Sequence, residues 1–430
     1  MVEVSLADAE SRLIDVLRGN DLGGYTVPTR GLYPFQWNWD AGFTALGWAA
    51  FDEPRAWREL TRLLDGQWDD GMIPHIVFHA ASAEYFPGPD VWGVGGEPPT
   101  SGITQPPVLG FVVADMLARA RDRALAEARI AALYPALLGN LRWWRDARTV
   151  DGLALCYHPW ETGMDNSPAW DEPLVRVPET ATAFRRRDTE HVAGGERPSD
   201  SEYGRYVYLV ELFRDCGYDP ARLRRESPFQ VADIATNAIL CRSASCLGAL
   251  AERFGSRGER VELDALADEL RAAAARLWDR QRRNYLSLDA ANGRLIPVST
   301  SAGFLAPFGG LPTPARADLQ TAELSRWLAG VHYAVPSVAA DDASFDARRY
   351  WRGPVWAVVN WMIGRGLSEY GYTALTDRVR ADTRALLLAN GPREYFDPVD
   401  GTGLGGDRFS WTAATGLAWA LAGAADPPSG

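Results

Sequence analysis

The sequence predicts an all-α protein in which a single domain, residues 1–430, closes its helices into a ring, an α-toroid. Apolar residues recur with helical spacing along most of the chain, and no repeated alternation of strands and helices interrupts them. Long loops rich in glycine, proline and aromatic residues separate the helices, and no linker of disordered composition divides the chain. Roughly eleven to thirteen helices, at about 36 residues for each helix with its loop, fit one such ring.

Local patterns justify each helix. Over residues 5–19, Leu6, Leu13 and Val16 lie near helical spacing and Gly19 ends the segment. The same spacing predicts helices at 54–65, 107–121, 124–145, 203–216, 230–254, 261–283, 320–329, 354–370 and 373–389. Short extended pieces are expected near 294–299 and 395–398. Loops are expected at 20–39, 68–106, 157–202, 285–318, 333–353 and 391–410, gathered at one end of the ring.

The composition excludes several classes of function. A net charge of −12 without basic blocks argues against nucleic acid and anionic membranes as partners. All 44 basic residues are arginine, which excludes Schiff-base and P-loop chemistry through lysine. Cys156, Cys216, Cys241 and Cys246 lack CxxC spacing and predict neither disulfides nor a zinc site. No apolar run reaches the roughly 18–20 residues that span a bilayer and no signal pattern begins the chain, so a cytoplasmic location is expected.

Aromatic residues point to a carbohydrate. The chain has 17 tryptophans, and the indole ring stacks well on the apolar face of a sugar. Tyr33, Trp37, Trp39 and Asp40 lie together where an apolar helix begins. Asp40 is either an N-cap or a carboxylate that accepts sugar hydroxyls, and the flanking aromatics favour the second interpretation.

Two further segments carry weaker signals. His75 and His79 are four residues apart, but Pro74 precedes the first and no third ligand completes a metal site, so structural histidines are favoured over metal ligands. Tyr85 belongs to an aromatic turn that could lean over a pocket. Gln105, before a Pro-Pro helix start, could bind a ligand hydroxyl.

The segment 158–168 carries the sharpest signal for glycosidic cleavage. Glu161 and Asp165 stand around a glycine in a loop closed by Trp160 and Trp170. Such cleavage needs a carboxylic acid held protonated near neutral pH, and an apolar, tryptophan-lined environment raises the pKa of a carboxyl group. The competing interpretation is a capping aspartate with a surface glutamate.

A second acid lies near the C-terminus. Glu394 stands among aromatics, 229 positions after Asp165, so only folding could pair them. The glycine-rich stretch 401–406 lacks a preceding strand pattern and a GK[ST] sequence, which favours a turned loop over a phosphate cradle.

Two arginine-containing elements combine the cation with aromatic rings. Arg197 and Tyr203 form the first, and Tyr350, Trp351 and Trp356 surround Arg352 in the second. Arginine suits the bidentate binding of a carboxylate, although surface ion pairing explains any one of these residues equally well.

These segments resemble glycoside hydrolase family 63 and its relatives, in particular the bacterial mannosylglycerate and glucosylglycerate hydrolases, which are inverting α-glycosidases. The matching strings are LRGNDLGG, YPFQWNWDAGF, QWDDGMIPHIVFH, YFPGP, SGITQPPV, WETGMDNSPAWD, RPSDSEYGRY, YWRGPVW and EYFDP followed by FSWTAA. They occur in order over residues 17–414. WETGMDNSP combined with EYFDP and SWTAA is specific, whereas the glycine-rich stretch alone is not.

The resemblance implies an (α/α)6 barrel and hydrolysis of 2-O-α-D-mannosyl- or 2-O-α-D-glucosyl-D-glycerate, a small anionic α-glycoside, without a metal or organic cofactor. It makes Asp165 the general acid and Glu394 the general base, with their carboxyl groups roughly 6.5–9.5 Å apart. It assigns the sugar to Tyr33, Trp37, Trp39, Asp40, Tyr85, Gln105 and Trp356, and the glycerate carboxylate to Arg197, surrounded by Tyr203, Tyr350 and Trp351.

Two alternatives stay open at this point. A related toroid glycosidase could act on trehalose or on a terminal α-glucose of an oligosaccharide. A sugar-binding toroid without catalysis would keep the tryptophans but would not need Asp165 and Glu394. The C2 epimer of the hexose and the oligomeric state, a homo-oligomer included, are not decided by these motifs.

Overall fold

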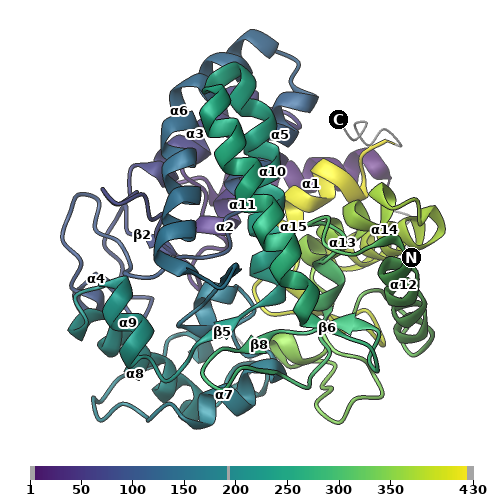
Figure 1. The fold of residues 1–430 in the computed structure, drawn as a ribbon. Helices are drawn as coiled ribbons and strands as arrows, with labels where there is room; N and C mark the ends of the chain where they lie inside the picture. The colour runs from purple at the N-terminus through teal and green to yellow at the C-terminus, as the bar shows by residue number, and fades with distance from the viewer. Residues whose placement is uncertain (1–4, 191–193, 424–430) are drawn as a thin grey trace.

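The computed structural model describes residues 5–190 and 194–423 and is built mainly of helices (Figure 1). The α-helices are α1 (Leu6–Asn20), α2 (Asn38–Ala49), α3 (Glu53–Leu64), α4 (Pro89–Trp92), α5 (Leu109–Arg119), α6 (Arg123–Trp143), α7 (Asp171–Val175), α8 (Asp200–Asp215), α9 (Pro220–Glu226), α10 (Ile234–Phe254), α11 (Arg257–Ala274), α12 (Pro314–Ala329), α13 (Ala357–Glu369), α14 (Thr373–Asn390) and α15 (Ser410–Thr415). This helix-rich architecture confirms the predicted all-α class.

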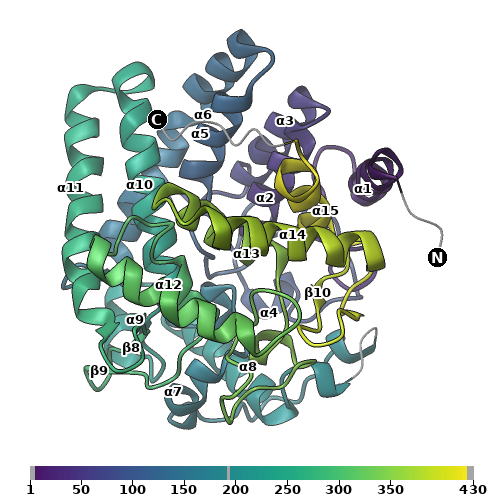
Figure 2. The ribbon, with the colours of Figure 1, turned by 90° about the vertical axis from the view of Figure 1, so that its right-hand side faces the viewer.

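Helix contacts run around a closed circuit. Helix α2 contacts α5, α5 contacts α10, and α10 contacts the 3₁₀ turn Ser301–Leu305. That turn contacts α13, α13 contacts α15, and α15 returns to α2. A second helix backs most of these elements: α3 lies on α2, α6 on α5, α11 on α10, α14 on α13 and α1 on α15. The long antiparallel pair α10–α11 and the crossing pair α13–α14 are both visible in Figure 2.

Polar residues at the helix starts explain where many of the helices begin. The side chains of Ser5, Asp52, Asp122 and Asp233 each accept a backbone N–H from the first turn of α1, α3, α6 and α10. Ser199 and Ser256 form complete capping boxes with a glutamate three residues later. These caps satisfy backbone donors that have no partner inside the helix.

Short antiparallel strands join the helices at one end. The pairs are β1 (Gln36–Trp37) with β2 (Ile76–Val77), β3 (Thr149–Val150) with β4 (Leu153–Ala154), β6 (Trp278–Asp279) with β7 (Asn284–Tyr285), and β10 (Tyr395–Phe396) with β11 (Gly403–Leu404). Strand β8 (Leu288–Asp289) lies between β5 (Val231–Ala232) and β9 (Arg294–Leu295). Strands β5, β6 and β8 lie in the lower part of Figure 1 with α7, α8 and α9, beyond the end of α10.

Most helix predictions hold, and the remaining ones need correction. The segment predicted as helix over 261–283 ends as α11 at Ala274 and continues into the β6–β7 hairpin, because Asn284 and Tyr285 pair with residues 278–279. Helix α12 begins six residues before the predicted start, at Pro314, which is capped by Thr313. The short helices α4, α7, α9 and α15 were not predicted, because their lengths of 4, 5, 7 and 6 residues are too small for a helical period to show. The extended pieces near 294–299 and 395–398 are confirmed by β9 and β10.

Helix α10 is long and apolar enough, by length and composition alone, to cross a membrane. However, 72% of its most apolar window is buried within the protein. It packs against α5, α6 and α11. These contacts are those of a core helix.

Candidate active site

A narrow pocket lies where the first residues of α2 and α15 meet the loops. Its lining is Pro28, Tyr33, Trp37, Trp39, Asp40, His75, Tyr85, Gln105, Trp160, Gly163, Asp165, Tyr350, Glu394, Phe409 and Trp411. The space between these side chains is about 450 Å³, open solvent included. A pocket of this kind, aromatic with a few convergent polar groups, suits a small polar ligand.

Asp165 stands on a tightly turned loop. A 3₁₀ turn, Pro159–Thr162, leads into Gly163, whose φ of +71° is in the left-handed region. A Cβ atom at position 163 would come within 2.6 Å of the Trp39 ring. Glycine is therefore required twice, by the backbone conformation and by the close approach of Trp39.

The carboxyl group of Asp165 favours its protonated form. Burial among the pocket residues raises its pKa to about 8, and the negative charge of Glu394 adds to this rise. The Arg197 cation opposes the shift. The side chain is only half-buried in accessible surface, because it faces the pocket space. A carboxylic acid that keeps its proton at neutral pH can act as a general acid.

Glu394 has the opposite surroundings. Its Oε2 accepts hydrogen bonds from Arg197 Nη2 at 2.8 Å and from the Gly406 N–H at 2.7 Å. Its Oε1 accepts from the Tyr33 hydroxyl at 3.1 Å. These three donors fix the position of the carboxyl group in the pocket. Two carboxyl groups from distant parts of the chain thus share one pocket, and they differ in their hydrogen-bond partners.

The first turn of α2 and the segment before α5 form one wall. Trp39 and Asp40 project from α2, and the backbone N–H of Trp39 donates to Gln105 Oε1 at 3.2 Å. Burial raises the pKa of Asp40 well above its usual range, and the charges of Glu394 and Asp165 add to this shift. The Trp37 ring contacts Tyr33 and Tyr85 edge-on, with ring centroids 5.3 and 5.2 Å apart.

The predicted site residues fall into two layers. Tyr33, Trp37, Trp39, Asp40, Tyr85, Gln105, Asp165, Tyr350 and Glu394 line the pocket. Behind them, Arg197 donates to the Tyr33 hydroxyl at 2.7 Å and to Glu394, and its guanidinium lies 4.4 Å from the Tyr350 ring centre. Tyr203 donates to the Phe86 carbonyl at 2.7 Å, next to Tyr85. Trp351 and Trp356 stack on each other with centroids 3.8 Å apart.

Six lining residues were absent from the predicted site: Pro28, His75, Trp160, Gly163, Phe409 and Trp411. Trp160, Phe409 and Trp411 belong to the matching strings WETGMD and FSWTAA, so those strings already contained the signal. His75 was predicted to be a structural histidine rather than a metal ligand, and its ring lies beside Trp37 and Trp160 at the pocket wall. Burial lowers the pKa of His75 well below its usual range, so the imidazole is neutral.

The two histidines of the QWDDGMIPHIVFH string point to different places. His79 Nε2 lies 2.8 Å from Gln36 Oε1, away from the pocket, whereas His75 lines it. Across residues 5–190 and 194–423, no group of three or more His, Cys, Asp or Glu side chains is arranged to hold a metal ion.

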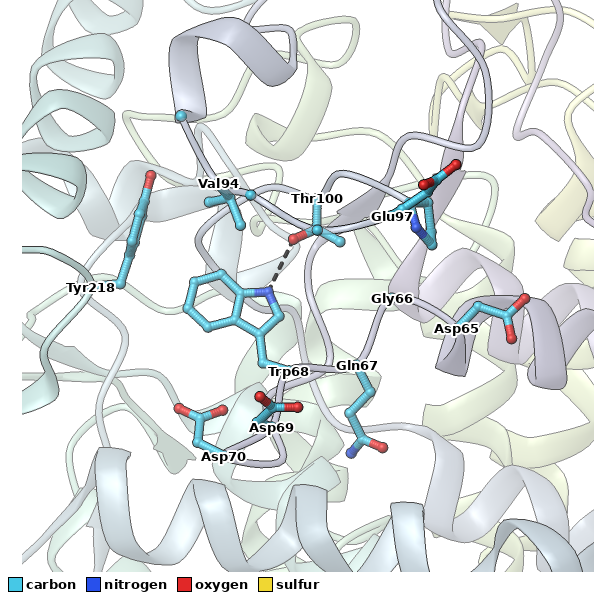
Figure 3. A pocket seen from close by; sticks show the side chains of 14 residues that line it. Asp65, Gly66, Gln67, Trp68, Asp69, Asp70, Val94, Glu97, Thr100 and Tyr218 are labelled. Atoms are coloured by element: carbon cyan, nitrogen blue, oxygen red, sulfur yellow. Dashed lines mark hydrogen bonds between the residues drawn. The ribbon is translucent and has the colours of Figure 1, made fainter.

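A wider hollow lies elsewhere, around Trp68 (Figure 3). It encloses about 1140 Å³ including open solvent, and its acids are Asp65, Asp69, Asp70 and Glu97. Asp65 pairs with Arg62, and Asp70 accepts from Trp143 Nε1. The Trp68 indole N–H donates to Thr100 Oγ1 at 3.0 Å, so this ring is already fixed within the protein. None of these four acids is buried, so the hollow holds no buried carboxyl group that could act as a general acid beside a second one acting as a base.

The chain is similar to glycoside hydrolases over almost its whole length. The family model described as the mannosylglycerate hydrolase MGH1-like glycoside hydrolase domain matches residues 33–412. A mannosylglycerate hydrolase from Thermus thermophilus is 48% identical over 414 residues, 95% of this chain and 99% of the relative. A glucosylglycerate hydrolase from Mycolicibacterium hassiacum is 36% identical over 432 residues, 95% of this chain and 97% of the relative.

A solved structure supports the same relationship. The crystal structure of a GH63 mannosylglycerate hydrolase from Thermus thermophilus in complex with Tris and D-glycerate superposes with a TM-score of 0.93. It is 47% identical and covers 96% of this chain and 99% of its own. Together with the two carboxyl groups that line one aromatic pocket, these comparisons show that the chain belongs to the mannosylglycerate hydrolase MGH1-like family of glycoside hydrolases.

Proposed function

We propose that this enzyme hydrolyses 2-O-α-D-mannosyl-D-glycerate, 2-O-α-D-glucosyl-D-glycerate or both, releasing the free hexose and D-glycerate with inversion at the anomeric carbon. The observation that carries the proposal is the pairing of Asp165, with a pKa raised to about 8, and Glu394, held by three donors, in one pocket. The names of the relatives from Thermus thermophilus and Mycolicibacterium hassiacum support the two substrates.

In the proposed reaction, the Asp165 proton passes to the glycosidic oxygen as the bond from that oxygen to C1 breaks. A water molecule attacks C1 from the opposite face and gives its proton to Glu394. The hexose therefore leaves as the β-anomer, and glycerate leaves with its oxygen protonated. An inverting reaction needs room for this water, so the two carboxyl groups should stand roughly 6.5–9.5 Å apart.

The hexose is proposed to lie against the wall formed by Trp37, Trp39 and Tyr85. Its hydroxyl groups would hydrogen-bond Asp40, Gln105 and Tyr33. Trp356 would support this wall from behind, through its stack on Trp351. Polar groups of buried side chains hold sugar hydroxyls well because leaving them unpaired costs free energy.

The glycerate carboxylate is proposed to bind Arg197. The Nε–H of this guanidinium is buried without a hydrogen-bond partner among the described residues, while both Nη atoms are engaged. An arriving carboxylate would supply the missing acceptor, with Tyr203, Tyr350 and Trp351 around it. The same cation would then contact both the substrate anion and the general base.

The fold is proposed to be a single-domain (α/α)6 barrel. The closed circuit of α2, α5, α10, the 301–305 turn, α13 and α15 supplies six inner elements. Helices α3, α6, α11, α14 and α1 lie on five of them, and α12 is the sixth, since Trp327 contacts Phe304 with centroids 4.9 Å apart. The proposed chemistry involves no metal or organic cofactor.

A substrate panel tests the proposal. Purified protein is incubated with mannosylglycerate, glucosylglycerate, trehalose and kojibiose, and the anomer first released is followed by NMR. Rapid cleavage of a glycerate glycoside with initial release of the β-hexose is expected. Preferential cleavage of trehalose or kojibiose, or initial release of the α-hexose, would refute the proposal.

A further inference from the structure

The loop that carries Asp165 contains a second acid, Glu161, whose carboxylate is buried. Glu161 is fully buried, contrary to the surface-residue interpretation, and it accepts a hydrogen bond from Arg148 Nη2 at 2.6 Å. It also accepts the Tyr157 N–H at 2.7 Å and the Thr104 N–H at 3.5 Å. Since Thr104 precedes Gln105, this single carboxylate ties the Asp165 loop to the wall that holds Trp39.

The partner of Glu161 is itself fixed. The Arg148 guanidinium lies over the rings of Trp143, Tyr157 and Phe213, at 5.0, 4.9 and 5.6 Å from their centres. A cation enclosed by aromatic rings and paired with one carboxylate has little freedom to move. Glu161 is therefore held in place from both sides of the loop.

A second contact fixes Asp165 itself. The hydroxyl of Tyr206, on helix α8, donates to the Asp165 main-chain carbonyl at 2.9 Å. His158 closes the arrangement: its Nδ1 accepts the Trp160 N–H, so its Nε2 carries the proton that it donates to the Tyr206 carbonyl at 3.0 Å. The loop is thus attached to α8 at both its beginning and its end.

We propose that Glu161 and Tyr206 are positioning residues that hold the Asp165 carboxyl at the leaving oxygen of the substrate. This inference rests on the proposed role of Asp165 as the general acid. A general acid must come within hydrogen-bond reach of the oxygen that it protonates. A displacement of about 1 Å can cost roughly 100-fold in rate.

Comparing two substrates with different leaving groups distinguishes a positioning role of Glu161 and Tyr206 from a merely structural one. Tyr206→Phe and Glu161→Gln are assayed on the hexosyl glycerate and on the α-fluoride of the same hexose. With the fluoride, C1–F breaks, fluoride departs with the bonding electrons, and water adds to C1 while its proton goes to Glu394. This departure needs no proton from Asp165. Each variant should lose roughly 10- to 100-fold in kcat/KM on the glycerate substrate and stay close to wild type on the fluoride.

Two matched control variants show whether losing a comparable buried contact elsewhere in the protein changes the ratio of the two activities. Tyr370→Phe removes the same kind of bond, from a tyrosine hydroxyl to the Pro312 carbonyl at 2.8 Å, far from the Asp165 loop. Glu59→Gln alters another fully buried glutamate paired with an arginine, Arg55, at 2.9 Å. Neither control should change the ratio of the two activities. Equal losses on both substrates in Tyr206→Phe and Glu161→Gln would overturn the inference.

Asp165→Asn serves as the reference for loss of the acid. It should show the same selective loss, larger in size. If Asp165→Asn instead loses activity equally on both substrates, the acid role fails and the inference fails with it. If Asp165→Asn is selective and the two positioning variants are not, only the inference is overturned.

Discussion

Replacing Asp165 by asparagine should strongly reduce hydrolysis of the glycerate glycoside and stabilise the fold at the same time. Asparagine is close in shape and cannot donate a proton to the leaving oxygen. The loss of a general acid costs typically 10²- to 10⁴-fold in rate. The stability gain follows from the raised pKa, because the native protein keeps a proton on Asp165 that the unfolded chain releases.

The sign and size of this gain come from the two pKa values. In the native state the pKa of Asp165 is about 8. In the unfolded chain an aspartate ionises near pH 3.9. The wild-type protein therefore loses stability as the pH rises from about 4 to about 8, and the loss is complete above pH 8. At pH 7 it amounts to about 4 kcal/mol at most, and contact of the half-buried side chain with pocket water reduces it.

Two measurements test this prediction. Urea unfolding at pH 5 and pH 8 should show that the stability advantage of Asp165→Asn grows with pH. Initial rates should show a wild-type kcat/KM that falls as the pH rises through about 8, when Asp165 loses its proton. A variant with near-wild-type kcat, or a stability difference that does not depend on pH, would refute the reasoning.

Other variants examine the remaining parts of the site. Glu394→Gln should lower kcat by at least about 100-fold while circular dichroism stays unchanged, and retained activity would contradict its role as base. Arg197→Ala should raise KM for a glycerate glycoside far more than for a neutral α-glycoside, and equal increases would exclude carboxylate binding. Gly163→Ala should destabilise the protein by about 1–3 kcal/mol in urea unfolding, because the added Cβ meets Trp39 at a φ of +71°; an unchanged unfolding midpoint would contradict this. His75→Ala should lower kcat/KM by about 10-fold, because a neutral histidine in the pocket can hydrogen-bond the substrate. EDTA should leave the activity of the wild type unchanged, and inhibition by EDTA would indicate a metal.

Local sequence determined the helices because each signal lies within a few residues. The periodicity of 5–19 and the capping serines and aspartates need no tertiary contact to be recognised. The same locality explains the failures. Helix α9 is too short to show a period, and the β6–β7 hairpin interrupts a segment whose residues favour helix. Pairing between 278–279 and 284–285 outweighs that propensity.

The chemistry of the site was also readable in part. Asp165 near tryptophans and Glu394 beside Tyr395 and Phe396 stood out by residue type, and the resemblance to one family singled them out as a pair. Nine of the thirteen predicted site residues line the pocket. The spacing of His75 and His79 did not require the two rings to share one face, and the structure places them in different environments, with only His75 at the pocket.

The sequence by itself determined that this protein is helical, acidic, free of lysine and equipped with two aromatic-flanked acids. Only the tertiary structure decided that Asp165 and Glu394, 229 positions apart, face one pocket and differ in their surroundings. Only folding showed Glu161 fully buried against Arg148. The physical reason is that burial and donor contacts, which set the protonation of a carboxyl group, come from residues far away in the chain.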